Sequence, residues 1–235
     1  MSATVAVVLC AGMGARAGGS VNKVFLELAG RSILERAVRP FCDHSAVDEV
    51  YVVAAPDEIG MASEVLRRAG LDVAGVMAGG DTRYQSESNA VEHLAGRIEA
   101  GEVGMVIVHD GARPLFDGDG LDELIAAARR SVGAICALPV TDDLVVSAGH
   151  EVDRWVPHGA LWRALTPQVF QAGLLLEAFR AAGRDGFEGT DTASTVERIG
   201  GRVEVVPGDP RNLKVTYPED LAIAEHLAEP EPPSF

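Results

Sequence analysis

Short apolar segments alternate with helical patterns along most of this chain, and that alternation limits its fold more than any other feature. The apolar segments that read as strands are Thr4–Leu9, Glu49–Ala55, Leu71–Ala78, Val103–His109 and Gly133–Pro139, then Arg202–Val206 and Leu213–Val215. The helical patterns are Ser32–Cys42, Asp57–Ala69, Arg83–Ala95, Gly120–Arg130 and Leu174–Ala182, then one after Asp191 and one from Pro218. This β–α–β order predicts an α/β fold, a mostly parallel sheet with helices on both faces.

One polar segment, residues 140–165, departs from this alternation. It contains two β-like stretches, Leu144–Ser147 and Arg154–Val156, and therefore predicts a protruding hairpin-like arm. Such a protrusion often packs against another subunit. Since no second boundary is visible, we expect one domain over residues 1–229, including the arm, and a flexible tail at 230–235.

Charge and cysteine content narrow the class of protein. The formal net charge of −15 argues against partners such as nucleic acid or an anionic membrane. No apolar run approaches the roughly 18 residues of a membrane span, and the first residues lack the basic start of a signal peptide. Cys10, Cys42 and Cys136 are isolated, and the histidines lack zinc-ligand spacing. These features predict a reduced, soluble, cytoplasmic protein without a structural metal.

The first strand runs into a glycine-rich loop. Gly12, Gly14 and Ala17 match the dinucleotide fingerprint, so an NAD-dependent oxidoreductase is one hypothesis. That motif, however, needs an immediate helix and an acidic residue about 20 positions later at the end of the next strand, and neither is present. Backbone N–H groups of such a loop can approach phosphates closely, and Arg16 and Lys23 supply positive charge. A glycine-rich turn with two solvated cations is the alternative.

Three loops are expected to meet at one edge of the sheet. The carboxyl ends of parallel strands share an edge, where ligands of such folds bind. The glycine loop, Gly79-Gly80-Asp81 and His109-Asp110 all follow predicted strands. Taken singly, Gly79-Gly80-Asp81 could be an ordinary turn and His109-Asp110 could be a strand cap. Thr190-Asp191 could simply cap a helix.

Motifs along nearly the whole chain resemble one enzyme family. They are Ala11-Gly12-Met13-Gly14-Ala15-Arg16, Lys23, Gly79-Gly80-Asp81, Val108–Pro114 (VHDGARP), Thr166-Pro167-Gln168, Thr190-Asp191 and Asn212–Leu221 (NLKVTYPEDL). In this order they resemble the 2-C-methyl-D-erythritol 4-phosphate cytidylyltransferases of non-mevalonate isoprenoid synthesis, and the relatives that make CDP-ribitol.

The resemblance implies a Rossmann-like nucleotidyltransferase fold and a homodimer whose arms reach the partner's site. It also implies transfer of CMP from CTP to a small alcohol phosphate, with Mg²⁺ held mainly by the CTP phosphates and no dedicated protein ligands for it. The catalytic residues it implies are Arg16, Lys23 and Lys214. The nucleotide-binding residues it implies are Cys10, Ala11, Gly12, Gly14, Gly79, Gly80, Asp81 and Ser86. The acceptor-binding residues it implies are Asp110, Arg113, Asp143, His158, Thr166 and Thr190.

Several positions depart from the family pattern. Asn22 stands where a proline is usual before Lys23, which predicts a looser loop, and Thr192 replaces a usual glutamate. Asp143 replaces a threonine and His158 an arginine, which predicts weaker recognition of the acceptor phosphate. Three hypotheses therefore stand beside the methylerythritol phosphate enzyme. They are a cytidylyltransferase for ribitol 5-phosphate, one for another acceptor such as a phosphonate, and an inactive nucleotide-binding paralogue.

Overall fold

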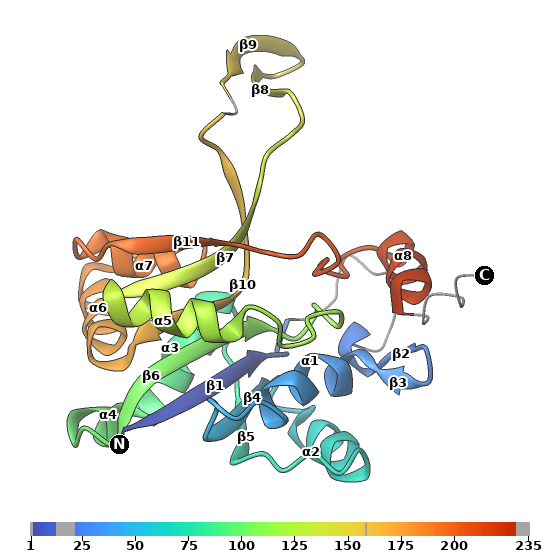
Figure 1. The fold of residues 1–235 in the computed structure, drawn as a ribbon, viewed down its shortest axis with the longest axis vertical. Helices are drawn as coiled ribbons and strands as arrows, with labels where there is room; N and C mark the ends of the chain where they lie inside the picture. Colours follow the sequence, from blue (N-terminus) through green and yellow to red (C-terminus); the bar gives the residue numbers. More distant parts are fainter. Residues whose placement is uncertain (1, 13–21, 158, 229–235) are drawn as a thin grey trace.

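The structure, a computed structural model, describes residues 2–12, 22–157 and 159–228. Among these residues a seven-stranded sheet with the order β11-β7-β10-β6-β1-β4-β5 forms the centre (Figure 1). Its strands are β1 (Ala3–Leu9), β4 (Glu49–Ala54), β5 (Gly75–Ala78), β6 (Val103–Asp110), β7 (Gly133–Pro139), β10 (Trp162–Gln171) and β11 (Val203–Pro207). Strand β1 pairs in parallel with β4 and β6, so the predicted mostly parallel sheet is confirmed.

The sequence-based strand assignment was wrong in two places. Strand β10, antiparallel to β6 and β7, was not predicted, because Thr166, Gln168 and Gln171 interrupt its apolar pattern. Thr166 and Gln168 are nevertheless buried. Leu213–Val215 was predicted as a strand, but it lies in an irregular segment where Val215 N donates to Ala112 O at 2.8 Å.

Helices alternate with the strands as predicted, although the short helix α4 was not predicted. They are α1 (Ile33–Cys42), α2 (Ile59–Arg68), α3 (Arg83–His93), α4 (Ala95–Glu99), α5 (Leu121–Arg130), α6 (Ala172–Asp185), α7 (Thr192–Arg198) and α8 (Pro218–Ala228), with the 3-10 helix η1 (Lys23–Phe25) and the short strands β2 (Glu27–Leu28) and β3 (Arg31–Ser32). Helix α1 begins directly after its N-cap Ser32, whose Oγ accepts from Glu35 N at 3.0 Å. In the described part of the chain, no helix is long and apolar enough to cross a membrane.

Apolar side chains cover both faces of the sheet. Along β1, Ala6 and Val8 pack into one core with Phe41 of α1, whereas Val5 and Val7 pack into a second core on the opposite face. That second core is built largely from α3 and α6. Both faces of β1 are therefore buried, which explains its continuous apolar sequence.

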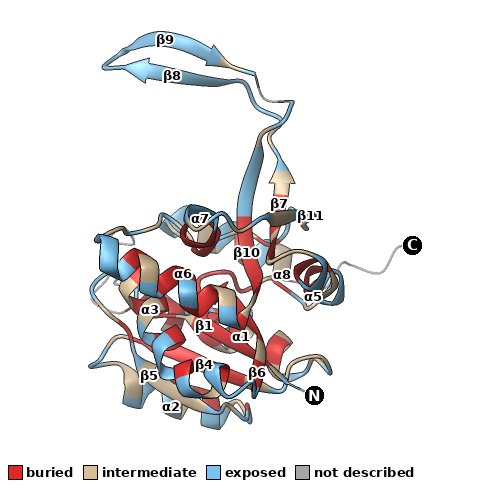
Figure 2. Cartoon of the chain, turned by 90° about the vertical axis from the view of Figure 1, so that its left-hand side faces the viewer, coloured by how far each residue is buried: buried red, intermediate tan, exposed pale blue. Residues whose placement is uncertain are grey.

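The predicted arm is confirmed as a β-hairpin that projects from the body of the protein (Figures 1 and 2). Strands β8 (Leu144–Ala148) and β9 (Glu151–Val156) pair antiparallel, between β7 and β10 in the chain. All residues of β8 are exposed, and Trp155 of β9 is 67% exposed. The arm thus presents apolar side chains to the outside.

Candidate active site

The loops after β1 and β5 touch at the carboxyl edge of the sheet. Cys10 N donates to Val53 O at 2.7 Å, and Gly79 N donates to Ala54 O at 2.8 Å, so both loops are hydrogen-bonded to the end of β4, the strand between β1 and β5. A Cβ on Gly79 would meet the Cβ of Ala11 and would lie 2.7 Å from Ser86 Oγ. Ala11, Gly79 and Ser86, all predicted to bind the nucleotide, therefore lie side by side.

The turn from Gly79 into α3 is held by side chains of the helix's first turn. Ser86 Oγ accepts from Gly80 N at 3.1 Å, and Gln85 Oε1 accepts from Asp81 N at 2.8 Å. Thr82 caps the helix by accepting from Gln85 N at 3.1 Å. Ser86 is buried and Asp81 is exposed, so the turn is anchored on the side of Ser86 and accessible to a ligand at Asp81.

Asn22 joins the two ends of the glycine loop. Its Nδ2 donates to Cys10 O at 3.0 Å and to Glu58 Oε2 at 2.8 Å, and its Oδ1 accepts from Val24 N at 3.3 Å. A proline side chain could make none of these hydrogen bonds. The contacts of Asn22 therefore hold this segment in place, whereas a looser loop was expected from the sequence. The next residue, Lys23, opens η1. The predicted residues Gly14 and Arg16 lie outside the described residues.

Asp110, at the end of β6, pairs with cations from three directions within the described structure. Its Oδ2 lies 2.9 Å from Lys214 Nζ and 3.5 Å from Arg113 Nε, and its Oδ1 lies 3.3 Å from Arg83 Nε. Burial alone would raise the pKa of this carboxyl, but the three cations hold it well below its usual range. Asp110 is therefore an ionised carboxylate.

Buried hydrogen bonds fix the backbone around Asp110. Asp110 N donates to Thr166 Oγ1 at 3.0 Å, and that hydroxyl lies 3.1 Å from His109 Nδ1. Asn212 Nδ2 donates to Thr166 O at 2.8 Å, and Arg113 Nη1 donates to Asn212 O at 2.8 Å. Burial lowers the pKa of His109 to about 3, so its imidazole is neutral. Thr166 and Arg113, predicted to contact the acceptor, are buried supports of Asp110 in this arrangement.

Two other predicted acceptor residues, Thr190 and Asp143, are exposed. Thr190 is exposed, directly before Asp191, which caps α7 by accepting from Ser194 N at 2.9 Å. Gln168 Nε2 donates to Asp191 Oδ2 at 3.2 Å and ties this cap to β10. Asp143 directly precedes β8 in the exposed arm. His158 lies outside the described residues.

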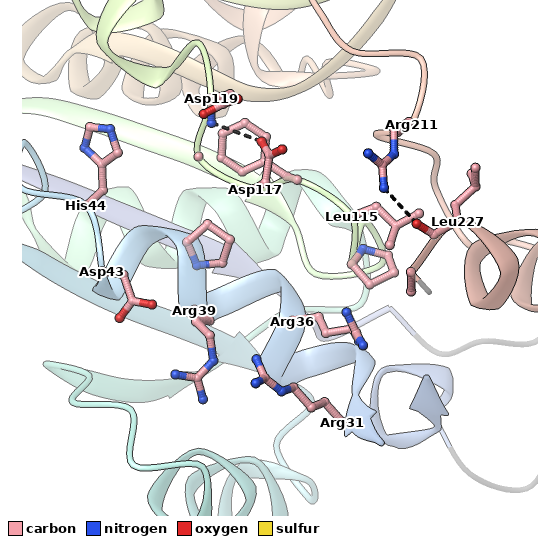
Figure 3. A pocket seen from close by; sticks show the side chains of 15 residues that line it. Arg31, Arg36, Arg39, Asp43, His44, Leu115, Asp117, Asp119, Arg211 and Leu227 are labelled. Atoms are coloured by element: carbon pink, nitrogen blue, oxygen red, sulfur yellow. Dashed lines mark hydrogen bonds between the residues drawn. The ribbon is translucent and has the colours of Figure 1, made fainter. Parts of the chain in front are cut away.

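A cavity of about 470 Å³ lies apart from these groups, between α1, the segment after Arg113 and the end of α8 (Figure 3). Of the candidate site residues that the structure describes, none lines it. Its arginines are already engaged: Arg36 Nε donates to Leu28 O at 2.7 Å, and Arg39 pairs with Glu35 at 2.8 Å. We therefore do not place the active site there.

Comparison with known proteins identifies the family. The family model of 2-C-methyl-D-erythritol 4-phosphate cytidylyltransferase matches residues 4–229. The chain belongs to this family. It is 40% identical over 225 residues to the 2-C-methyl-D-erythritol 4-phosphate cytidylyltransferase of Geobacter metallireducens, covering 95% of this chain and 96% of that protein.

Solved structures agree with this cytidylyltransferase assignment. A crystal structure of 4-diphosphocytidyl-2C-methyl-D-erythritol synthase has a TM-score of 0.80 and 33% identity, covering 97% of this chain and 100% of that one. The 2-C-methyl-D-erythritol 4-phosphate cytidylyltransferase of Thermus thermophilus has a TM-score of 0.73 and 33% identity, covering 97% of this chain and 99% of that one. The nucleotidyltransferase fold, the family resemblance and the enzyme class predicted from the sequence are confirmed.

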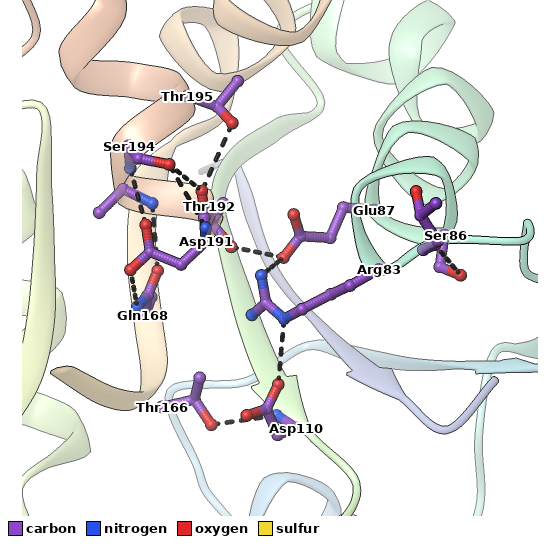
Figure 4. Close-up of polar contacts among 12 residues, drawn as sticks. Arg83, Ser86, Glu87, Asp110, Thr166, Gln168, Asp191, Thr192, Ser194 and Thr195 are labelled. Carbon is purple, nitrogen blue, oxygen red and sulfur yellow. Dashed lines mark hydrogen bonds and ion pairs between the residues drawn. The ribbon is translucent and has the colours of Figure 1, made fainter. Parts of the chain in front are cut away.

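Sequence reasoning missed several residues of this cytidylyltransferase site. No role was assigned to Arg83 or Glu87 from the sequence, yet Arg83 pairs with Asp110 and Glu87 is buried (Figure 4). Asn212 was noticed only as part of a motif, although it bonds the backbone of Thr166. The position of Arg83, just after Gly79-Gly80-Asp81, was the available signal.

Proposed function

We propose that this chain transfers CMP from CTP to 2-C-methyl-D-erythritol 4-phosphate and releases pyrophosphate. Family membership over residues 4–229 supports this reaction. The structural observation that carries it is the pairing of Lys214 with the ionised Asp110, at the edge where the Ala11 and Gly79 loops meet. At that edge, the surface formed by the two loops can bind an anionic nucleotide, and the Asp110 carboxylate beside it can accept hydrogen bonds from hydroxyl groups.

The proposed chemistry is one in-line displacement. An oxygen of the acceptor phosphate forms a bond to the α-phosphorus of CTP, while the bond from that phosphorus to the pyrophosphate oxygen breaks. Catalysis then rests on positioning and on stabilising negative charge at the phosphoryl oxygens. We assign that charge stabilisation to Arg16, Lys23 and Lys214.

The nucleotide half of the site uses mainly backbone. Gly79 lets the chain pass close to Ala11, and the tip at the half-buried Gly80 and the exposed Asp81 offers polar groups to a nucleobase. Cys10 packs behind this surface, since a Cβ on Gly111 would meet its Sγ. Burial strongly raises the pKa of the Cys10 thiol, so we assign it a packing role rather than a nucleophilic one.

The acceptor half centres on Asp110 and Lys214. Asp110 is an acceptor for polyol hydroxyls, and Lys214, whose side chain is 42% exposed, is a cation for the acceptor phosphate. Because Arg113 is buried beneath them, it keeps Asp110 charged and oriented. The neutral His109 and Thr166 complete this support.

Mg²⁺ is proposed as the cofactor, carried by the CTP phosphates. The donor set fits this arrangement, because Asp110 is already paired with cations and Asp81 is exposed at the tip of the turn. Mg²⁺ bound to phosphates keeps several waters and needs few protein ligands. When bound, it supplies neutralisation of phosphate charge.

We propose a homodimer formed through the arm, whose Asp143 and His158 then face the partner's acceptor phosphate. Its support is the exposed apolar surface of the hairpin, with Trp155 67% and Val152 55% exposed. Light scattering should give twice the chain's 24.7 kDa. Trp155→Glu should shift the mass towards the monomer. A dimeric Trp155→Glu protein, or a monomeric wild type, would contradict this interface.

A reducing, cytoplasmic setting is also proposed. Cys10 and Cys136 are buried free thiols, and Cys42 is half-buried. Burial raises the pKa of Cys42 to about 11, which keeps it protonated at neutral pH. Such thiols suit a compartment where disulfides are not formed.

The decisive assay measures pyrophosphate release from CTP and Mg²⁺ with 2-C-methyl-D-erythritol 4-phosphate as acceptor. Ribitol 5-phosphate, a matched polyol phosphate, serves as the comparison substrate. Rapid release with the first acceptor and slow release with the second is the expected result. Preference for ribitol 5-phosphate, or CTP binding without release, would overturn the proposed acceptor or the activity itself.

A further inference from the structure

Arg83 lies between two carboxylates that belong to different elements (Figure 4). Its Nε lies 3.3 Å from Asp110 Oδ1 at the end of β6. Its Nη1 pairs with Glu87 Oε1, one turn further along α3. The Glu87 side chain is only 2% exposed. Arg83 thus joins the acceptor carboxylate to a buried group on the nucleotide-side helix.

Glu87 is itself held from a third element. Thr192 Oγ1, at the start of α7, donates to Glu87 Oε1 at 2.6 Å, and Thr192 is fully buried. The cap of the same helix, Asp191, is tied to β10 through Gln168. A continuous chain of contacts therefore runs from α7 through Glu87 and Arg83 to Asp110.

This arrangement is poorly explained by stability alone. Desolvating a carboxylate and a guanidinium costs free energy that their attraction recovers only in part, so buried pairs are weak evidence for stability. The pair of Glu87 and Arg83 has a clearer effect on the position of the Arg83 guanidinium. Without Glu87, Arg83 would still pair with Asp110, and its guanidinium could turn and draw Asp110 away from Lys214.

We propose that Glu87 is a positioning residue for the acceptor: it holds Arg83 against Asp110 without touching either substrate. This inference rests on the proposed function, in which Asp110 binds the acceptor. Arg83 contacts Asp110 directly, so an Arg83 variant would remove both the charge beside Asp110 and the link to Glu87. Glu87 offers the cleaner test, because its link to Asp110 runs through Arg83.

The ionisation of Glu87 adds a second signature. Burial raises its pKa to about 7, while Arg83 and the Thr192 hydrogen bond oppose that rise and Asp110 and Asp191 add repulsion. These groups face Glu87 from α3, β6 and the start of α7. Below neutral pH, protonation of Glu87 therefore weakens its hold on Arg83, and acceptor binding should weaken with it.

The kinetic test replaces Glu87 by glutamine, which keeps the shape and removes the charge. Glu87→Gln should raise the acceptor KM on the order of tenfold, as expected for loss of a charged hydrogen bond, and leave the KM for CTP within about twofold. Glu87→Asp should recover part of the loss. Glu92→Gln is the matched control, because Glu92 lies on the same helix but pairs at the surface with Arg180.

The pH profile separates positioning from general damage. The acceptor phosphate itself titrates at about pH 6, and this affects the wild type and Glu87→Gln equally. Only the wild type should show a further rise in acceptor KM as the pH falls through about 7. Equal KM increases for both substrates, or identical pH profiles, would overturn the proposal.

A spectroscopic readout keeps the test independent of turnover. The Nε–H resonance of Arg83, assigned by its disappearance in Arg83→Lys, should shift with a midpoint near pH 7 in the wild type and stay constant in Glu87→Gln. No such shift would reject the Glu87 link even in an active enzyme. A shift in a protein without pyrophosphate release would instead reject the proposed function and keep the link.

Discussion

Lys214 Nζ lies 2.9 Å from Asp110 Oδ2, although 104 positions separate the two residues in the chain. Asp110 ends a central strand, whereas Lys214 lies in an irregular segment that follows β11. That segment is docked by Val215 N, which donates to Ala112 O, and by the Asn212 bond to Thr166. The site therefore depends on hydrogen bonds, one of them from the Asn212 side chain, that bring the far end of the chain to β6.

Lys214→Gln should reduce kcat/KM by about 100-fold, the usual scale for loss of one stabilising group at a developing charge. The structural reason is that Lys214 is the most exposed of the three cations that pair with Asp110 and can reach a phosphate. Steady-state pyrophosphate release measures the effect. Arg130→Gln, which breaks a surface pair with Glu204, is the control and should leave kcat/KM unchanged. An active Lys214→Gln enzyme would remove Lys214 from the mechanism.

Gly79→Ala should weaken CTP binding and destabilise the fold by about 1–3 kcal/mol, the range for an overpacked site. The added Cβ would meet the Cβ of Ala11 and lie 2.7 Å from Ser86 Oγ. Urea unfolding and calorimetric CTP titration give the two quantities. Gly96→Ala adds the same methyl group in α4 where no atom lies within 4 Å, so stability there should be unchanged or slightly higher. Unaltered CTP affinity in Gly79→Ala would show that the close approach to Ala11 is not needed.

The fold was largely predictable from the sequence because its central strands are apolar on both faces. Strands β1, β4, β6 and β7 therefore appear as continuous apolar runs. Strand β10 escaped because its buried Thr166 and Gln168 are satisfied by hydrogen bonds that only the tertiary structure supplies. A polar residue in a strand reads as exposed until its partners are known.

The candidate site was predictable where it is marked by motifs, and less so where it depends on burial. Asp110 and Lys214 stood out in specific motifs, and the structure brings them together. Glu87 did not stand out, because one glutamate in α3 looks like any solvated charge until its 2% exposure is known. Asn22 was read as a loosening substitution, because its hydrogen bonds to Cys10 and Glu58 are visible only in the folded chain.

Asn22→Ala should raise the KM for CTP more than it changes the acceptor KM. The variant loses the hydrogen bonds from Nδ2 to Cys10 O and Glu58, so Lys23 is no longer held in a defined place relative to the end of β1. Initial rates at varied CTP test this expectation. Asn89→Ala, which removes one exposed hydrogen bond to Ala78 O, is the matched control. Equal changes in both KM values would show that Asn22 supports the fold generally and not the glycine loop.

His109 makes the stability of the protein fall as the solution becomes acidic. Because burial lowers its folded pKa to about 3, the unfolded chain, with a histidine pKa of about 6.5, binds a proton that the folded chain refuses. The free energy of unfolding should therefore be highest above pH 6.5 and fall by about 2–3 kcal/mol by pH 4.5 through this residue alone. Urea unfolding at the two pH values measures the loss, and His109→Gln should show a smaller one. His226→Gln, at an exposed position of the C-terminal helix α8, is the control for replacing a histidine, and its free energy of unfolding at neutral pH should match that of the wild type. A His109→Gln protein with an unchanged slope would mean that other groups cause the acid sensitivity.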